Sequence, residues 1–526
     1  MVQEIQLRTN LIEEKKAGTL LYKAARKLGV DSKEISGIKV LRKSIDARKK
    51  ETFFNYKVAV FINEPIPEKS STVFDYKEVS NAKEIHIVGF GPSGMYAALR
   101  CIELGYKPII LERGKNVQER RRDIKAINQD HIVNENSNYC YGEGGAGTYS
   151  DGKLYTRSKK RGDVDRILQL LVYFGAHENI LVEAHPHIGT NKLPQIIEKI
   201  REFIIEKGGE VHFESKLTDL KVDLNKIKSF EINHANWIES DTLILATGHS
   251  ARDIFYLLQK HKIRIEAKPF AIGVRVEHQQ ELIDTIQYHG DGENPYLPPA
   301  SYSLVEQVDG LGVYSFCMCP GGIIAPCATS QQEVVTNGWS PSKRNNPYAN
   351  SGIVVSVDMA DVRTKNNLQD PLALLRFQQQ VEQLAFKAGG GNLQAPAQRL
   401  VDFCENRSSI NLPSCSYVPG IVSVNLKEVL PSFIHERLQL GFKQIAQKMR
   451  TYYTNDAVLV ATESRTSSPV RIPRDAEKLH HPQVSTLFPC GEGAGYAGGI
   501  VSAAMDGERV AVVILQQWGI KTTLPS

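Results

Sequence analysis

The spacing of apolar residues beyond position 80 predicts a parallel sheet with helices between its strands. A strand-like run over 84–88 is followed by a helical pattern over 93–104 and by a second strand-like run over 107–112. Strand, helix and strand in this order are typical of a βαβ unit. The pattern continues with a helix over 193–207, a strand over 210–214 and a strand over 242–246. We therefore expect an α/β fold.

A small front segment precedes this region. Residues 19–28 have the apolar spacing of a helix that ends at a glycine, and residues 38–44 and 52–62 are rich in the β-branched and aromatic residues of strands. The Pro- and Ser-containing stretch 64–71 predicts a linker, because proline cannot donate to a sheet ladder. For residues 1–70 we therefore expect a small α+β domain, with a ferredoxin-like arrangement as the candidate.

A loosely patterned region interrupts the α/β part of the chain. Between about 271 and 453, short strands and helices alternate with loops rich in Gly, Pro and Asn, and a strand over 485–489 and a helix over 499–516 then resume the α/β pattern. We expect a three-layer, Rossmann-like dinucleotide-binding domain with an inserted mixed, largely β substrate domain. The expected bounds are 1–70 for the small domain, 80–270 and 454–526 for the two parts of the dinucleotide domain, and 271–453 for the insertion.

Composition places the chain among globular proteins with sizeable cores. Of its 526 residues, 41% are hydrophobic and 23% are charged, and no stretch approaches the ~20 apolar residues of a membrane helix. The opening residues lack an apolar core, so we expect no secretory signal, no membrane contact and a cytoplasmic location. The eight cysteines form no CxxC pair and no regular framework. This disfavours a disulfide scaffold or structural zinc, and we expect no metal.

The net charge of +5 belongs to the front segment. Residues 1–80 hold 16 basic and 11 acidic side chains, and the remaining charges cancel. The basic residues include the runs 42–43 and 48–50, for which a solvated charged face is the favoured interpretation. Aromatic residues are only sparsely interleaved, so we expect no nucleic-acid partner, although that alternative stays open for this domain.

The strongest motif is a GxGxxG run between the first strand and the first helix of the α/β part. Gly89 allows a tight turn, Gly91 lets the backbone approach a pyrophosphate, and Gly94 lets the helix pack closely on the strand. Glu112 ends the next strand, 23 residues after Gly89, where a carboxylate can accept hydrogen bonds from an adenosine ribose. The helix N-terminus faces the phosphates in such a site. We also expect the neighbouring residues Pro92, Ser93 and Arg113 to contact the cofactor.

The C-terminal region favours FAD over NAD as the dinucleotide. A strand there leads through glycines and an acidic residue into a long helix, whose N-terminus beneath an isoalloxazine would stabilise reduced flavin. Thr247 and Gly248 close another apolar strand, as is common near a flavin. The expected flavin contacts in the C-terminal region are Gly491, Glu492, Gly498, Gly499 and Ile500.

A glycine-rich loop over 142–153 follows the first βαβ unit. Its glycines would let backbone amides approach phosphate or the flavin ring, and its lysine could add charge; a flexible surface loop is the alternative. The expected contacts are Gly144, Gly145, Gly147, Thr148, Lys153 and Leu154. Only Cys140 lies nearby, which disfavours a flavin disulfide reductase, since that class would need a cysteine pair here.

Several blocks of the sequence belong together as one pattern. They are GFGPSGMYAALRCIELG, GEGGAGTYSDGKL, KPFAIGVRVEH and PCGEGAGYAGGIVSAAMDG, with CMCPGG and TNGWS in the insertion. This pattern resembles a bacterial family of FAD-dependent, NAD(FAD)-utilising dehydrogenases within the glutathione-reductase-like FAD-binding superfamily. The resemblance covers most of the chain from about residue 80 and implies FAD as the cofactor.

Two groups in the insertion are weak catalytic candidates. Cys317 and Cys319 are separated by one residue, and we interpret them as pointing to opposite faces of a strand, so that both sulfurs cannot easily meet one flavin. A disulfide between them would also be strained, and we expect no working dithiol. His278, at a strand end, could act as an acid or base, but a structural role is favoured. A third group could clamp an anionic substrate or a nicotinamide phosphate, namely Arg465, Arg471 and Arg474.

These observations predict an FAD-dependent oxidoreductase. The flavin would transfer hydride or electrons between a small-molecule substrate and a donor or acceptor, with NAD(P)H as the candidate donor. Only one GxGxxG is present, so a nicotinamide would bind transiently. Two alternatives stay open: an FAD-dependent monooxygenase, and a flavin-containing binding protein whose basic front domain contacts RNA or a protein partner.

Overall fold

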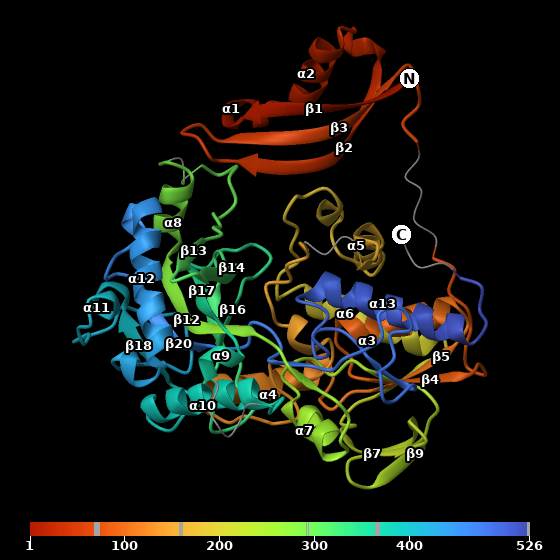
Figure 1. Ribbon diagram of the computed structural model, residues 1–526. Coiled ribbons are helices and arrows are strands. Elements are labelled where there is room, and N and C mark those ends of the chain that lie inside the picture. Colours follow the sequence, from red (N-terminus) through yellow and green to blue (C-terminus); the bar gives the residue numbers. More distant parts are fainter. Residues whose placement is uncertain (68–73, 157–160, 291, 293, 363–368, 523–526) are drawn as a thin grey trace.

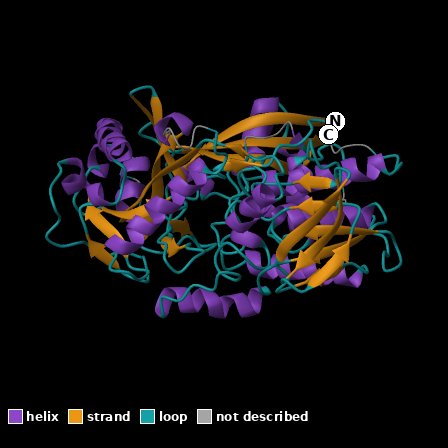
Figure 2. Ribbon diagram, turned by 60° about the horizontal axis from the view of Figure 1, so that its bottom comes forward, coloured by secondary structure: helices purple, strands orange, loops and turns teal. Residues whose placement is uncertain are grey.

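The computed structural model describes residues 1–67, 74–156, 161–290, 292, 294–362 and 369–522. A small N-terminal domain projects from a body in which a parallel sheet and a largely antiparallel sheet lie side by side (Figure 1). Helices accompany the strands in both parts of this body (Figure 2). Among the described residues, no helix combines the length and apolar character needed to cross a membrane.

The N-terminal domain is a three-stranded antiparallel sheet with one full helix. Its strands run in the order β1-β3-β2, and helix α2 ends where Gly29 adopts φ +69°. Periodicity missed the first strand. The elements are β1 (Val2–Asn10), α1 (Leu11–Glu14), α2 (Thr19–Leu28), β2 (Ile35–Asp46) and β3 (Phe53–Ile62). The described part of this domain therefore falls short of the two-helix, four-strand ferredoxin-like arrangement that we considered.

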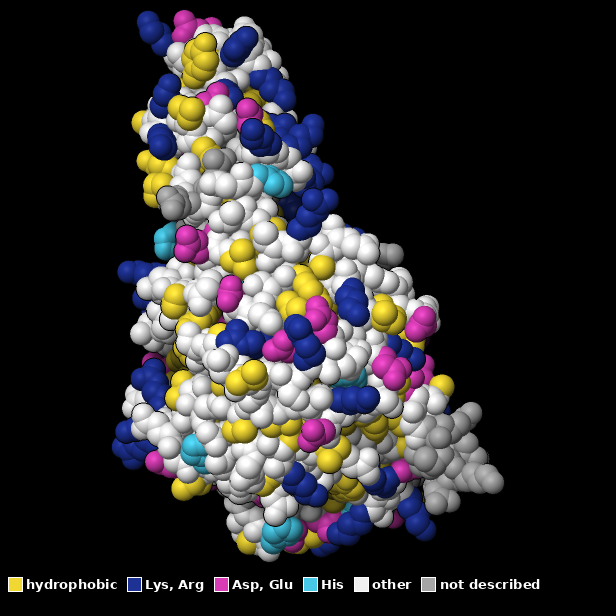
Figure 3. All heavy atoms as spheres, turned by 90° about the vertical axis from the view of Figure 1, so that its left-hand side faces the viewer, with side chains coloured by type: hydrophobic (Ala, Val, Ile, Leu, Met, Phe, Trp, Pro, Cys, Tyr) yellow, Lys and Arg dark blue, Asp and Glu magenta, His cyan; other side chains and the backbone are white. Residues whose placement is uncertain are grey.

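Basic side chains gather along one side of this projecting domain (Figure 3). Its strand β2 joins the body, where the backbone N–H of Lys43 donates to the carbonyl of Val182 and the N–H of Ala184 donates to the carbonyl of Lys43. Behind it, residues 64–67 of the expected linker form no helix or strand, and 68–71 lie outside the described residues.

The centre of the dinucleotide domain is a five-stranded, all-parallel sheet in the order β22-β10-β4-β5-β6. Apolar residues alternate between its two faces: Ile85 and Ile87 pack with the helices, whereas Val88 packs on the opposite side. The strands are β4 (Glu84–Val88), β5 (Lys107–Leu111), β6 (Glu210–His212), β10 (Leu243–Leu245) and β22 (Leu487–Pro489).

Helices cover one face of this sheet and a β-meander covers the other, which makes three layers (Figure 1). The helical layer contains α3 (Pro92–Glu103), α5 (Val164–Tyr173), α6 (Leu193–Glu206) and α13 (Ile500–Gln517). The opposite layer contains β7 (Leu217–Asp223), β8 (Lys226–Ile232), β9 (Asn236–Glu239) and α7 (Arg252–Lys260). A further helix, α4 (Val117–Gln129), precedes the glycine-rich loop.

The inserted region forms a seven-stranded sheet in the order β13-β14-β17-β12-β20-β18-β19, antiparallel except for the β18–β19 pair. Its strands are β12 (Phe270–Gln279), β13 (Val305–Val308), β14 (Leu311–Cys319), β17 (Tyr348–Val357), β18 (Ala395–Arg399), β19 (Ile421–Ser423) and β20 (Val458–Glu463). A hairpin of β15 (Ile323–Pro326) and β16 (Thr336–Trp339) accompanies it. The main helices are α8 (Gln280–Gln287), α10 (Ala373–Ala388) and α12 (Ser432–Lys448).

Strand β20 sets the end of the insertion. It pairs with β12 and β18, although it lies beyond the boundary expected at residue 453. The antiparallel sheet therefore continues at least to Glu463. The chain returns to the parallel sheet at β22 and then enters α13, which packs on α3.

Candidate cofactor and active site

A cavity of about 430 Å³ opens at the carboxyl ends of the parallel strands, where open α/β sheets bind their ligands. The segments after β4, β5, β10 and β22 line it, together with the glycine-rich loop and the start of α13. Phe316 and Cys317 of β14 line it from the inserted domain. One cavity therefore joins both parts of the body.

The structure brings most of the expected cofactor residues to this cavity. Those that line it are Gly89, Gly91, Pro92, Ser93, Glu112, Arg113, Gly145, Gly147, Lys153, Thr247, Gly248, Glu492, Gly498, Gly499 and Ile500. Those that do not are Gly94, Gly144, Thr148, Leu154 and Gly491. The second group lies behind the cavity wall.

The glycines of the GxGxxG turn have different neighbours. A Cβ at Gly94 would lie 2.0 Å from the carbonyl oxygen of Gly89, so this glycine permits close packing of α3 on the turn. A Cβ at Gly91 would meet only the Cα of Gly145, at 3.9 Å, and Gly91 has an ordinary φ of −80°. The protein itself does not require glycine at Gly91, which leaves room for a ligand at the helix N-terminus.

Glu112 is fixed where the sequence predicted an acidic residue. Its carboxylate accepts hydrogen bonds from the backbone N–H groups of Phe90, Gly114 and Gly142, each at 2.9 Å. A carboxylate has about four acceptor positions, so one remains for a ligand hydroxyl. Arg113 lies beside it, where it bonds to Asp253 at 2.9 Å.

The glycine-rich loop is held by a residue that the sequence did not single out. Arg120 of α4 is fully buried, and its guanidinium donates to the carbonyls of Asn138, Tyr139, Glu143 and Gly145. It also donates to the Thr148 hydroxyl at 3.2 Å. Thr148 therefore supports the loop from behind. Nothing in the sequence indicated this role, because Arg120 stands among other charged and polar residues of α4.

The start of α13 closes the other end of the cavity. Gly498 and Gly499 line it, and a Cβ on either would meet nothing within 4 Å. Gly491, in contrast, contacts α3, because a Cβ there would lie 2.0 Å from the Ser93 hydroxyl. Helix α13 thus presents its N-terminus to open space, as expected for a helix that faces a flavin.

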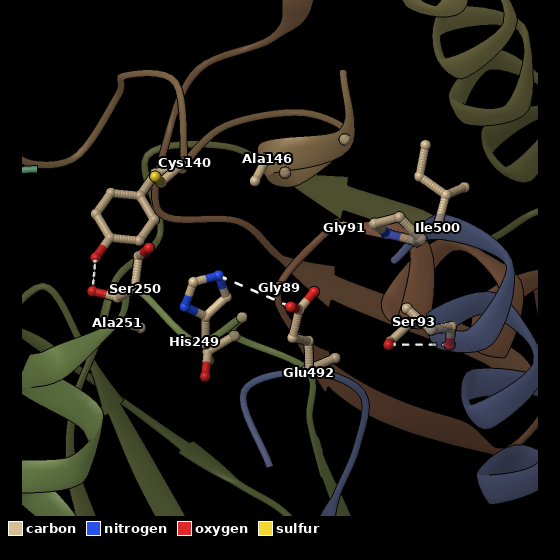
Figure 4. A pocket seen from close by; sticks show the side chains of 18 of the residues that line it. Gly89, Gly91, Ser93, Cys140, Ala146, His249, Ser250, Ala251, Glu492 and Ile500 are labelled. Atoms are coloured by element: carbon tan, nitrogen blue, oxygen red, sulfur yellow. Dashed lines mark hydrogen bonds and ion pairs between the residues drawn. The ribbon is translucent and has the colours of Figure 1, made fainter. Parts of the chain in front are cut away.

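His249 and Glu492 point toward each other inside the cavity (Figure 4). His249 Nε2 lies 3.9 Å from a carboxylate oxygen of Glu492. The other ring nitrogen of His249, Nδ1, is buried and has no hydrogen-bond partner among the described residues. A buried polar atom of this kind normally has a partner, so the atom indicates a bound ligand or substrate. No sequence pattern singled out His249, although it directly follows the predicted Thr247–Gly248 pair.

The surroundings set the charge of this pair. Burial, with the cations Arg465 and Lys268, lowers the pKa of His249 to about 3, so its imidazole is neutral. Burial raises the pKa of Glu492 to about 7, against the opposing effects of Lys268 and the backbone of Gly499. The Glu492 side chain is 26% exposed, and the residue lines the cavity. Glu492 can therefore exchange a proton near neutral pH.

The two cysteines of the insertion converge, contrary to our expectation. A bulge interrupts β14 where Phe316 pairs with Gly352 and Cys319 pairs with Asn350. Cys317 and Met318 therefore lie opposite the single residue Ser351, and Cys317 has φ +45°. The two sulfurs lie 3.9 Å apart as a result. The prediction that they could not act together placed the two thiols on opposite faces of a strand and was wrong, because residues two positions apart on a strand share a face. The bulge adds a local change of direction at Cys317.

The remaining candidates are distributed differently. His278 lies in the core of the antiparallel sheet, where Nε2 bonds to the carbonyl of Tyr452 at 2.8 Å and burial lowers its pKa to about 4. Arg474 is paired with Asp506 at 2.6 Å, and Arg471 is exposed. Arg465 lines the cavity between Glu382 and Glu333. The three arginines therefore do not form one clamp.

No group of three or more His, Cys, Asp or Glu side chains within the described residues could hold a metal ion.

Comparison with known proteins identifies a family. Residues 269–466 match a family described as "FAD-dependent protein, C-terminal domain-like", and residues 1–61 match a domain of unknown function, DUF8436. An uncharacterized protein of Clostridium beijerinckii (strain ATCC 51743 / NCIMB 8052) is 40% identical over 530 residues, or 97% of this chain and 98% of the clostridial protein. The chain belongs to the same family as that protein.

FAD is the cofactor, and the cavity fits it. The open space at Gly91 suits a pyrophosphate, the carboxylate of Glu112 suits an adenosine ribose, and the glycines before α13 leave room for a flavin ring. The unpartnered Nδ1 of His249 supplies a polar contact in the same cavity. The family match to residues 269–466 spans the antiparallel sheet, including β20.

Solved structures also resemble this chain at low similarity. Tetracycline destructase Tet(51) is 12% identical with a TM-score of 0.33, over 83% of both chains. Glycine oxidase from Bacillus cereus ATCC 14579 is 10% identical with a TM-score of 0.33, over 83% of this chain and 96% of the other. The flavin-dependent brominase Bmp2 is 11% identical with a TM-score of 0.37, over 84% and 80%. At these scores the likeness carries no argument about activity.

Proposed function

We propose that this protein is an FAD-dependent oxidoreductase, a dehydrogenase or reductase that acts on a small molecule and takes electrons from NAD(P)H. The observation that carries the proposal is the pair of His249 and Glu492 in the FAD cavity, with an unpartnered ring nitrogen on His249. When bound, FAD supplies two-electron chemistry. The residues of the chain must then position the substrate and handle the accompanying proton.

Glu492 and His249 divide that work. The Glu492 carboxyl can hold or release a proton at neutral pH, because burial raises its pKa to about 7. The neutral imidazole of His249 can accept a hydrogen bond from one group and donate to another through its two ring nitrogens. The free Nδ1 is the atom available to a substrate. Phe316 and Tyr141 contribute aromatic rings to the wall of the same cavity.

The decisive experiment is anaerobic reduction of the purified, FAD-loaded protein by NADH and by NADPH, followed at the flavin absorption band. We expect the protein to release FAD, not FMN, on denaturation, and at least one nicotinamide to bleach the band. A flavin that dithionite bleaches but neither nicotinamide reduces would overturn the proposed donor. A colourless protein that FAD cannot reconstitute would overturn the whole assignment.

The single parallel sheet among the described residues bears on how a nicotinamide would bind. A dedicated nicotinamide domain would need a second sheet of this kind. We therefore expect NAD(P)H to enter the FAD cavity from the side of the inserted domain, and NAD(P)⁺ to leave once the flavin has been reduced. Saturation at high nicotinamide concentration, without a stable complex in gel filtration, would support this arrangement.

A further inference from the structure

The converging cysteines lie on the wall of the FAD cavity. Cys317 is half-buried and lines the cavity, whereas Cys319 is fully buried directly behind it. Their sulfurs are 3.9 Å apart. A disulfide has a sulfur separation of about 2 Å, so a movement of roughly 2 Å would join them. One accessible and one buried sulfur are what a reactive thiol and its resolving partner require.

Two cations surround this pair. The Lys153 ammonium lies 3.7 Å from the sulfur of Cys317 and 3.9 Å from that of Cys319. On the other side, the fully buried Arg275 guanidinium lies 3.7 Å from the Cys319 sulfur and donates to the carbonyl of Cys317. Positive groups at this distance stabilise a thiolate, which is the reactive form of cysteine.

Acidic groups complete the environment. Asp151 lies 3.8 Å from Lys153, and Glu463 is paired with Arg275 in the core. Burial raises the pKa of Glu463 to about 7, so this carboxylate only partly offsets the charge of Arg275 near neutral pH. The hydrogen bond with Cys319, together with Lys153 and Arg275 and against the effect of burial, holds the pKa of the Cys317 thiol well below its usual value. Burial raises the pKa of Cys319 well above its usual value.

The backbone favours the same interpretation. Cys317 adopts φ +45°, a left-handed conformation that is unfavourable for a non-glycine residue. The bulge turns its sulfur toward Lys153 and the cavity instead of leaving it in the regular alternation of β14. Strained positions of this kind cluster at functional sites.

We propose that Cys317 and Cys319 form a redox-active dithiol that exchanges two electrons with FAD, with Cys317 as the reactive sulfur and Cys319 as its resolving partner. The pair closes one S–S bond when the Cys317 thiolate and the Cys319 thiol give up two electrons and one proton. The oxidised isoalloxazine takes up those two electrons and that proton, so atoms and charge balance. The reverse step reopens the disulfide. This proposal rests on the proposed flavin-dependent function.

Anaerobic titration of the FAD-loaded protein with dithionite tests it. We expect the wild type to take up four electrons per FAD, and Cys317→Ser and Cys319→Ser each to take up two. The matched control is Cys140→Ser, since Cys140 is also half-buried and lines the same cavity; this variant should still take up four. Uptake of two electrons by the wild type, or a fall to two in Cys140→Ser, overturns the proposal.

A second readout does not depend on the flavin spectrum. After oxidation and alkylation, the peptide that contains Cys317 and Cys319 should carry no alkyl group and be lighter by two hydrogens, and after reduction it should carry two alkyl groups. Free thiols in the oxidised protein, or a disulfide to Cys140, overturn the assignment. A protein that takes up four electrons per FAD but whose flavin neither NADH nor NADPH reduces would contradict the proposed function alone. A protein whose flavin a nicotinamide reduces but that takes up only two electrons would contradict the dithiol alone, so the two failures are distinguishable.

Lys153 provides a test of positioning. Removal of its charge in Lys153→Met should shift the pH profile of Cys317 alkylation by iodoacetamide to higher pH, and Lys153→Arg should largely restore it. A purely structural role would leave the profile unchanged in Lys153→Met, and that result would remove Lys153 from the proposal.

Discussion

The hydroxyl of Ser93 donates a hydrogen bond to the carbonyl oxygen of Ala503 at 3.0 Å. The two residues are 410 positions apart in the sequence, and the whole inserted domain lies between them. Ser93 lies in the first turn of α3, and Ala503 lies in the first turn of α13. This bond joins the starts of the two helices whose N-terminal residues line the cavity.

Gly507 allows the two helices to approach. A Cβ there would lie 2.0 Å from the backbone carbonyl oxygen of Ser93. We expect Gly507→Ala to lower the free energy of unfolding by about 1–3 kcal/mol, because the helices must separate. Urea denaturation measures this change. Gln516→Ala, at an exposed position of the same helix, should stay within about 0.5 kcal/mol of the wild type; a similar loss in both variants would contradict the packing argument.

The space beside Gly91 is open to a ligand. We expect Gly91→Val to abolish FAD retention with little loss of stability, because an added Cβ would meet only the Cα of Gly145 and the branched side chain would occupy the space for the pyrophosphate. The ratio of FAD to protein after gel filtration, with thermal unfolding of the FAD-free proteins, measures both effects. Gly312→Val is a matched control in strand β14, outside the cavity. Wild-type FAD content in Gly91→Val would show that the turn is misassigned.

Arg120 supports the glycine-rich loop from inside the protein. Arg120→Met leaves several buried carbonyls without a donor, and each such group costs about 1–3 kcal/mol. We expect the free energy of unfolding to fall by about 3 kcal/mol or more, with weaker FAD binding, as measured by denaturation and flavin fluorescence. Arg122→Met, at an exposed position of the same helix, should change neither. Unchanged FAD affinity in Arg120→Met would show that the loop does not depend on this residue.

Glu492 should make the bound flavin sensitive to pH. Its pKa is raised to about 7 by burial, so the carboxyl is neutral below that pH and becomes charged as the pH rises through it. We expect the visible spectrum of bound FAD to titrate with a midpoint near pH 7 and Glu492→Gln to remove this transition. Glu508 is the matched control: burial raises its pKa to about 6, but it is paired with Arg166 away from the cavity. Loss of the spectral transition in Glu508→Gln would show that Glu508, and not Glu492, causes it.

Local patterns predicted the parallel sheet well. The strand predicted over 84–88 coincides with β4, and the helix predicted over 193–207 ends one residue beyond α6. These elements are recoverable because apolar periodicity, glycine stops and the GxGxxG spacing act over a few residues. The first strand of the N-terminal domain was missed because its less exposed face carries only two apolar side chains, Ile5 and Leu7, between the polar Gln3 and Thr9.

Residues that belong to a short motif were predicted to line the cavity more reliably than residues that merely lie near such a motif in the sequence. Gly91 and Glu112 line it because the strand–turn–helix geometry is local. Thr148 and Leu154 lie within a predicted loop but face its supports, and only the folded chain determines which side of a loop faces a ligand.

The sequence by itself determined the dinucleotide fold and the cofactor class, because turn, helix N-terminus and acidic strand end lie within one βαβ unit. Only the tertiary structure brought His249 to Glu492 and Lys153 to Cys317, since these partners come from segments separated by long stretches of chain. The bulge in β14 decided the relation of Cys317 to Cys319, because it depends on how that strand pairs with its neighbour β17. Strand periodicity alone already places residues two positions apart on one face, so our expectation of two separate thiols misapplied it. No periodic pattern records the register shift itself, and that shift sets how Cys317 is oriented.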